Sequence, residues 1–255
     1  MFKDGVLSYY MMGSRNKETI VLLHAAFADH QLFEQQIAFF QEHYQLILLD
    51  LPGHGENQTR GSKVTLADMP DIISLILADN RIASCHVLGV SLGSLVAQAF
   101  AARYPDQINS VIIVGGYSIH KANEQVLKAQ RREGLKWMFS IMLSLKSFKR
   151  RIARNTCSTE QGRRLMARSM ERFRRSSFLA MNGMNAFFVS NPSPVPYPLM
   201  IVVGEHDLPV ILESSRQWHE LEKGSHYTLL PGAGHCANAD TPDAFNRAVA
   251  HFLAP

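Results

Sequence analysis

Six short, nearly continuous apolar runs constrain the fold of this 255-residue chain more than any other feature. They are TIVLLHA (19–25), QLILLD (45–50), CHVLGV (85–90), NSVIIVGG (109–116), PLMIVVGE (198–205) and HYTLLPG (226–232). Such runs are typical of parallel strands that are covered on both faces. Stretches with helical spacing separate the runs, near 31–42, 66–79, 92–104, 210–222 and 242–253. This alternation predicts an α/β fold with a doubly wound, mostly parallel sheet, to which VLSYYMM (6–12) could add an antiparallel edge strand.

A serine between two glycines lies where one predicted strand passes directly into a predicted helix. Residues 89–93, Gly89-Val90-Ser91-Leu92-Gly93, have the form G-x-S-x-G. A sharp turn at this point needs neighbours without side chains, and it would raise the Ser91 hydroxyl above the sheet at a helix N-terminus. Ligand sites of parallel sheets lie beyond the carboxyl ends of the strands, so Ser91 is a candidate nucleophile. The alternative is a serine that only caps the helix.

A serine hydroxyl is a weak nucleophile at neutral pH, so it needs a base, and the base needs an orienting acid. Asp207 follows the predicted strand at 198–205, and His235 follows the predicted strand at 226–232. Both side chains are therefore expected at the same end of the sheet as Ser91. We predict that Ser91 is the nucleophile, His235 the general base and acid, and Asp207 the group that orients His235.

Three other residues carry side chains that could take part in such chemistry. We expect His54 to be structural, and Cys236 to be a packing residue rather than a second nucleophile. His206 precedes Asp207 directly, and on an extended segment it would point away from that carboxylate.

These motifs resemble those of the α/β-hydrolase superfamily, and the resemblance covers essentially the whole chain. The matching segments are LLHAAF, LLDLPGHGEN, GVSLGS, GEHD, GAGH and the closing stretch HCANADTPDAFNRAVAHFL. The resemblance implies an oxyanion hole made by two backbone N–H groups, those of Leu92 and of Ala26 in the loop after His24. The chain departs from the family pattern at Ala25, where glycine is usual, and at Ser94, where glycine or alanine is usual. We therefore expect a slightly different oxyanion loop.

The charge of the chain divides it into two parts. The net charge is +4, but residues 117–190 hold 16 Lys and Arg against 4 Glu, which leaves a net −8 on the rest. We therefore predict a hydrolase core formed by residues 1–116 and 191–255, with a basic helical lid at 117–190. Three interpretations of the lid charge stay open: a solvated outer face, attraction of an anionic substrate, and docking on an anionic membrane surface.

Helical spacing within 117–190 indicates which side of the lid faces the site. The basic positions on one predicted face are Arg164, Arg168, Arg172 and Arg175, and the apolar positions on the other are Met166, Met170 and Phe173. We expect the apolar face to roof the site. The methionines at 138, 142, 181 and 184 could add adaptable surface for an acyl chain or an aromatic group, or could be ordinary core of a small helical cap.

A serine nucleophile favours an acyl-serine intermediate formed on an ester, thioester, lactone or activated ketone. We therefore expect a carboxylesterase-like serine hydrolase that acts on small acyl substrates, which could be anionic, without a cofactor. Two alternatives stay open: a carbon–carbon bond hydrolase or lyase that uses the same triad, and a non-catalytic ligand-binding receptor of the same fold.

Other function classes find little support in the sequence. The histidines lack the paired spacing of a metal site, and no nucleic-acid module or glycine-rich phosphate loop is recognisable, so we expect neither metal nor nucleic acid. The three cysteines, Cys85, Cys157 and Cys236, are odd in number and far apart, which fits neither a disulfide framework nor a closely spaced zinc site. The first residues lack the apolar stretch of a signal peptide, which leads us to expect a cytoplasmic protein, either a monomer or a small homo-oligomer.

Overall fold

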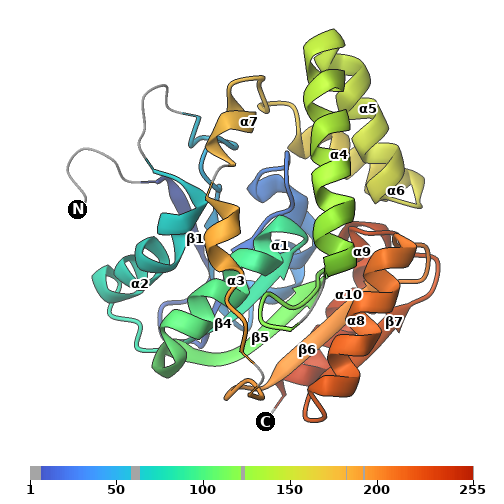
Figure 1. Ribbon diagram of the computed structural model, residues 1–255. Helices are drawn as coiled ribbons and strands as arrows, with labels where there is room; N and C mark the ends of the chain where they lie inside the picture. The colour runs from blue at the N-terminus through green and yellow to red at the C-terminus, as the bar shows by residue number, and fades with distance from the viewer. Residues whose placement is uncertain (1–6, 59–63, 122–123, 182, 192, 255) are drawn as a thin grey trace.

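A sheet of seven strands runs through the centre of the molecule in the order β1-β3-β2-β4-β5-β6-β7 (Figure 1). The computed structural model describes residues 7–58, 64–121, 124–181, 183–191 and 193–254. The strands are β1 (Tyr9–Met12), β2 (Thr19–Leu23), β3 (Gln45–Leu49), β4 (Cys85–Val90), β5 (Ile108–Val114), β6 (Leu199–Gly204) and β7 (His226–Leu230). β1 pairs antiparallel with β3, and the other pairs are parallel. The predicted doubly wound sheet and its antiparallel edge strand are confirmed.

Helices cover both faces of this sheet. One face carries α1 (Glu34–Phe40), which follows the short 3-10 turn η1 (His30–Phe33), together with α9 (Ala237–Asp240) and α10 (Pro242–Leu253). The other face carries α2 (Met69–Asp79), α3 (Leu92–Arg103) and α8 (Pro209–Leu221), with the 3-10 turns η2 (Leu66–Asp68) and η3 (Pro105–Gln107) alongside. Successive strand residues point to opposite faces, so the strands contribute to two separate apolar clusters, one on each side.

Burial along the strands explains why their sequences are so uniformly apolar. Every residue of β2, β3, β4 and β6 is buried, because each of these strands has a neighbour on both sides and helices on both faces. The edge strand β7 is instead partly exposed. The last residues of a central parallel strand are therefore held by both neighbouring strands. This also restrains the start of the loop that follows.

Between β5 and β6 the chain forms a group of helices that we call the helical insertion, residues 124–187. It comprises α4 (Glu124–Leu143), α5 (Leu145–Thr156), α6 (Glu160–Ser169), α7 (Ser177–Ala180) and the 3-10 turn η4 (Met184–Phe187). Helices α4, α5 and α6 stand together beyond one end of the sheet (Figure 1). Their apolar side chains join the cluster on the α1 and α10 face.

The structure corrects the basic face expected for this segment. Arg172 and Arg175 do not continue the face of Arg164 and Arg168, because α6 ends at Ser169 and the chain turns there. This turn brings Phe173 into the core, where Met166 and Met170 are also buried.

The methionines expected to add apolar surface differ from one another. Met142 is 68% exposed on the last turn of α4, so it does not line the interior. Met181 and Met184 are half-buried against the core, and the side chain of Met138 lies outside the described residues.

Candidate active site

Ser91 occupies a strained turn between β4 and α3. Its backbone has φ 52° and ψ −110°, a left-handed region that non-glycine residues rarely adopt. The Ser91 N–H donates to the carbonyl of Val114 at 2.8 Å, which ties the turn to β5. A Cβ atom at Gly89 would overlap the backbone of Gly93, and one at Gly93 would overlap the carbonyl of Leu23. Both glycines of the motif are therefore required by close backbone contact.

The three predicted triad residues meet at the carboxyl ends of β4, β6 and β7. The hydroxyl of Ser91 lies 2.8 Å from Nε2 of His235, and Nδ1 of His235 lies 2.8 Å from Oδ1 of Asp207. The same carboxylate oxygen accepts the backbone N–H of Leu208 at 2.6 Å. The side chains of Asp207 and His235 are 0% and 12% exposed, so water competes little for these hydrogen bonds. The arrangement can move a proton between a hydroxyl and an imidazole that is held in one orientation.

Two opposing effects set the protonation of His235. Burial disfavours the charged imidazolium, but the negative charge of Asp207 and its hydrogen bond to Nδ1 outweigh burial and raise the pKa of His235 above 6.5. The Asp207 contact places a proton on Nδ1, so Nε2 is free to accept the proton of Ser91 when the ring is neutral.

The loop that carries His235 is held by Asp240, a residue that the sequence analysis missed. Its carboxylate accepts the N–H groups of Gly234 at 2.8 Å, Ser158 at 2.8 Å and Thr159 at 2.9 Å, and also the Thr159 hydroxyl at 2.8 Å. Asp240 is 5% exposed. One buried carboxylate thus joins the histidine loop to the start of α6.

The two expected oxyanion-hole residues lie on adjoining segments. Leu92 is the first residue of α3, so its N–H has no carbonyl partner within the helix. Ala26 lies half-buried in the loop after β2. The start of α3 lies directly against the end of β2, since a side chain at Gly93 would overlap the carbonyls of Leu23 and His24.

Neither departure from the family pattern leaves strain at its own position. The left-handed non-glycine residues of the described chain are Phe27, Arg81 and Ser91, and Ala25 is not among them. The hydroxyl of Ser94 is buried and donates to the carbonyl of Ser91 at 2.5 Å. The unusual backbone angle of the loop after β2 falls instead on Phe27, with φ 71°.

Two buried histidines cross-link the loop after β2 to the loop after β3. Nε2 of His24 accepts the N–H of Leu51 at 2.9 Å, and Nε2 of His54 accepts the N–H of Phe27 at 3.0 Å. Burial lowers the pKa of His24, and it lowers that of His54 to about 3, so both rings stay neutral acceptors. His54 is therefore placed to hold a loop, in line with the structural role expected for it.

The remaining candidates lie outside the hydrogen-bonded triad. His206 is 59% exposed and lies beside Glu205. Cys236 is buried, and a hydrogen bond with Cys157 together with burial raises the pKa of its thiol well above 9.0, so it stays protonated. Within the described ranges we find no cluster of His, Cys, Asp and Glu that could hold a metal ion. In the same part of the chain, no helix is long and apolar enough to cross a membrane.

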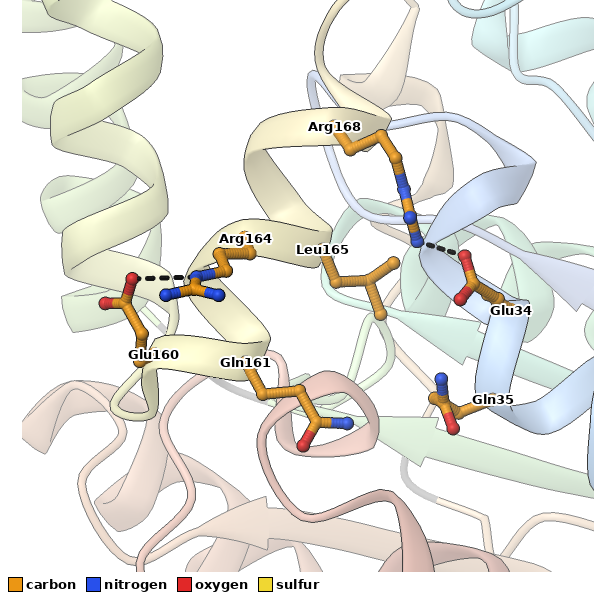
Figure 2. Close-up of a pocket in the computed structure, with 7 residues that line it drawn as sticks. All are labelled: Glu34, Gln35, Glu160, Gln161, Arg164, Leu165 and Arg168. Atoms are coloured by element: carbon orange, nitrogen blue, oxygen red, sulfur yellow. Dashed lines mark hydrogen bonds and ion pairs between the residues drawn. The ribbon is translucent and has the colours of Figure 1, made fainter.

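An open pocket of about 370 Å³ lies between α6 and the start of α1 (Figure 2), and no residue of the triad lines it. It is lined by Glu34, Gln35, Glu160, Gln161, Arg164, Leu165 and Arg168. Figure 2 shows Arg168 directed across the pocket to Glu34, and Arg164 paired with Glu160 on its own helix. Both arginines of this pocket are paired with carboxylates, so we interpret the pocket as part of the contact between the insertion and the core.

Comparison with known proteins agrees with the fold. Residues 18–143 match a family described as alpha/beta hydrolase fold. The chain is 22% identical over 239 residues to (E)-2-((N-methylformamido)methylene)succinate hydrolase of Acinetobacter baylyi, covering 92% of this chain and 90% of that protein. It is 26% identical over 254 residues to pimeloyl-[acyl-carrier protein] methyl ester esterase of Pectobacterium carotovorum, covering 96% and 97%. Several other relatives match over half of their own length or less.

Solved structures extend the agreement in fold to nearly the whole chain. The enol-lactonase of Burkholderia xenovorans superposes with a TM-score of 0.79 at 21% sequence identity, covering 97% of this chain and 96% of the enzyme. With the family match over residues 18–143 and the seven-stranded sheet, this establishes that the chain has the α/β-hydrolase fold. The proteins to which it is similar include hydrolases of several kinds.

Proposed function

We propose that this protein is a serine hydrolase that cleaves ester-type bonds of small acyl substrates. A single observation carries the proposal: the imidazole of His235 lies between the Ser91 hydroxyl and the Asp207 carboxylate, at 2.8 Å from each. Similar proteins named as an esterase and as lactonases support the class of bond.

The reaction proceeds in two halves around His235. In the first half, Nε2 takes the proton of Ser91 as Oγ bonds to the carbonyl carbon, and the N–H groups of Ala26 and Leu92 stabilise the resulting oxyanion. His235 then gives its proton to the leaving oxygen, the ester bond breaks, and an acyl-serine remains. In the second half, His235 deprotonates a water molecule that attacks this acyl group, and the same proton returns to Ser91 as the acid leaves. Asp207 holds the Nδ1 proton throughout.

The helical insertion belongs to the same proposal as the lid of the site. Residues 117–190 would form the lid, and residues 1–116 with 191–255 the core. The buried apolar side chains of the lid, among them Met166 and Phe173, would exclude water from the acyl-enzyme.

The test is labelling with a fluorophosphonate probe, combined with turnover of ester, lactone and thioester substrates. Wild-type protein should label and hydrolyse p-nitrophenyl acetate or butyrate, while Ser91→Ala should abolish labelling and lower kcat/KM by about 10⁴-fold or more. The matched control is Ser94→Ala, which removes a neighbouring buried hydroxyl and should keep labelling. A folded wild type that binds ligands but neither labels nor turns over any ester would favour the receptor alternative. Cleavage of a carbon–carbon bond without ester turnover would favour the alternative of a carbon–carbon bond hydrolase or lyase.

A further inference from the structure

Phe27 lies where the helical insertion meets the oxyanion loop. Its ring packs nearly edge-to-face against three rings, those of Trp137 in α4, Phe148 in α5 and Phe173 after α6, with centroid distances of 5.2, 5.0 and 5.1 Å. The interplanar angles are 88°, 85° and 78°, the arrangement that aromatic quadrupoles favour. Phe27 is 3% exposed. All three partner rings belong to the insertion, far from Phe27 in the sequence.

The backbone conformation of Phe27 requires stabilising contacts. A φ of 71° is unfavourable for a bulky side chain, and a strained conformation of this kind persists only when its surroundings determine it. The hydrogen bond from the Phe27 N–H to His54 fixes one end of the residue at 3.0 Å. The ring contacts fix the other end, because rotation out of the left-handed region would withdraw the ring from its three partners.

These restraints bear directly on the N–H of Ala26. A peptide unit is planar and trans, so its carbonyl and its N–H point in opposite directions. Nδ1 of His24 donates to the carbonyl of Ala25 at 2.8 Å, which orients the peptide unit that contains the Ala26 N–H. His54 orients the next peptide unit through Phe27. The peptide units on both sides of Ala26 are thus held by hydrogen bonds, and the second also depends on the insertion through Phe27.

We propose that Phe27 is a positioning residue through which the helical insertion holds the Ala26 N–H in its oxyanion-binding orientation. The proposal rests on the hydrolase function proposed above, and it makes the insertion part of the catalytic apparatus rather than only a roof. Loosening the ring cluster should weaken stabilisation of the oxyanion, which forms only in the reaction, and should leave ground-state substrate binding nearly unchanged.

The test uses substitutions in the insertion, at a distance from the triad. Phe148→Leu and Phe173→Leu, alone and combined, remove edge-to-face contacts but keep an apolar side chain. Trp137→Phe is the conservative variant that keeps an aromatic ring, and Phe139→Leu on the same helix is the matched control, since Phe139 is 65% exposed. Circular dichroism and thermal melting establish the folded fraction of each variant. The measurements are kcat and KM on a p-nitrophenyl ester, the inhibition constant of a trifluoromethyl ketone, and hydrogen–deuterium exchange of the Phe27 amide.

The combined Leu variant should lose about tenfold in kcat with KM within about twofold, a part of the 10²–10³-fold loss that follows removal of a whole oxyanion donor. The trifluoromethyl ketone, whose hemiketal oxyanion uses the same N–H groups, should bind about tenfold more weakly. The Phe27 amide should exchange faster, while Trp137→Phe and Phe139→Leu should stay close to wild type.

Three results would overturn the proposal. An unchanged kcat in folded Leu variants would separate the insertion from the oxyanion loop, and a rise in KM alone would make the ring cluster a substrate-binding surface. Unchanged exchange of the Phe27 amide would show that the insertion does not hold the loop, whether or not the protein hydrolyses esters. Failure of the hydrolase proposal itself is a separate result, recognised by a wild type that does not label at Ser91.

Discussion

The sheet core and the helical insertion are built on different principles. In the core, strands such as β2 and β4 are buried along their whole length, and neighbouring strands fix their backbones. In the insertion, α5 and α6 bury one side, while residues such as Arg150 and Arg164 lie exposed on the other. The core therefore sets the positions of Ser91, Asp207 and His235 through rigid strand ends. The insertion acts on that geometry through particular side-chain contacts, and this difference predicts which substitutions are severe.

The two parts also complement each other in charge. Arg168 in α6 forms an ion pair with Glu34 in α1, and Arg172 forms one with Glu56 in the loop after β3. Some of the positive charge of the insertion thus faces carboxylates of the acidic core. These two ion pairs link the insertion to the core, while other basic residues of the insertion, such as Arg150 and Arg164, lie exposed.

Among the substitutions considered from here on, Asp207→Asn should produce the largest loss of activity, because it removes the carboxylate that the core places beside His235. The amide cannot hold the Nδ1 proton of His235 in the same way, and we expect kcat to fall by about 10⁴-fold with the fold intact. In the wild type, the charge of Asp207 raises the pKa of His235 above 6.5, and the base must be neutral. Wild-type kcat/KM should therefore decline as pH falls through a value above 6.5, about tenfold per unit below it.

A pH profile of both proteins measures this effect. Without the negative charge, the residual activity of Asp207→Asn should persist to a lower pH than that of the wild type. Equal inflection points in the two profiles would contradict the assignment of the titrating group to His235.

A pair of glycine substitutions tests the contrast between core and insertion directly. Both Gly93 in α3 and Gly134 in α4 are helical, so helix propensity alone favours alanine at each by about 1 kcal/mol. A Cβ atom at Gly93 would overlap the backbone carbonyls of Leu23 and His24, whereas one at Gly134 meets nothing within 4 Å. Gly93→Ala should destabilise the protein by about 3 kcal/mol and lower ester turnover by about 10²-fold, because the turn at Ser91 must shift. Gly134→Ala should stabilise it by about 0.5–1 kcal/mol, measured by urea unfolding. Equal effects of the two substitutions would mean that the core is less rigid than proposed.

Asp240→Asn should have an intermediate effect, because it cuts one link between core and insertion. The amide keeps one acceptor oxygen but turns an NH₂ group toward N–H groups that the carboxylate now accepts, including those of Gly234 and Ser158. We expect a loss of about 2–3 kcal/mol in stability and about tenfold in kcat, since the Gly234 contact lies next to His235. Asp243→Asn, at an exposed position on α10, is the control. If Asp240→Asn lowers the melting temperature without changing kcat of the folded protein, Asp240 supports the fold alone.

The strands were predictable because parallel, doubly covered strands demand apolar residues at every position, as in β3 and β6. The convergence of Ser91, Asp207 and His235 was also predictable, since parallel strands end at one edge and the order of these residues matches the family. Both inferences depend on local patterns that backbone geometry turns into a unique arrangement.

Contacts between core and insertion left no comparable signal. A left-handed backbone is normally indicated by glycine, so nothing in the sequence marks Phe27, where the rings of the insertion and His54 determine φ. Asp240 stands in a helical pattern typical of a cap or a solvated face, and its partners Ser158 and Thr159 are distant in the sequence. The turn after Ser169 was missed for the same reason, because the burial of Phe173 overrides a helical spacing that continues past it.

The ion pairs between Arg168 and Glu34 and between Arg172 and Glu56 should give the smallest effect. Their side chains are about half exposed, so each pair should contribute less than about 1 kcal/mol, and salt should weaken it. Raising NaCl from about 0.05 to about 0.5 M, which shortens the Debye length severalfold, should lower wild-type stability slightly. In Arg168→Gln/Arg172→Gln this dependence should shrink, whereas the exposed Arg175→Gln should behave like wild type in thermal melts.

Kinetics on neutral and anionic esters over the same salt range distinguish a role of these arginines in attaching the insertion to the core from a role in attracting an anionic substrate. If kcat/KM of the double variant on anionic esters instead no longer depends on salt, and its stability profile stays that of the wild type, these arginines attract the substrate and do not hold the insertion to the core.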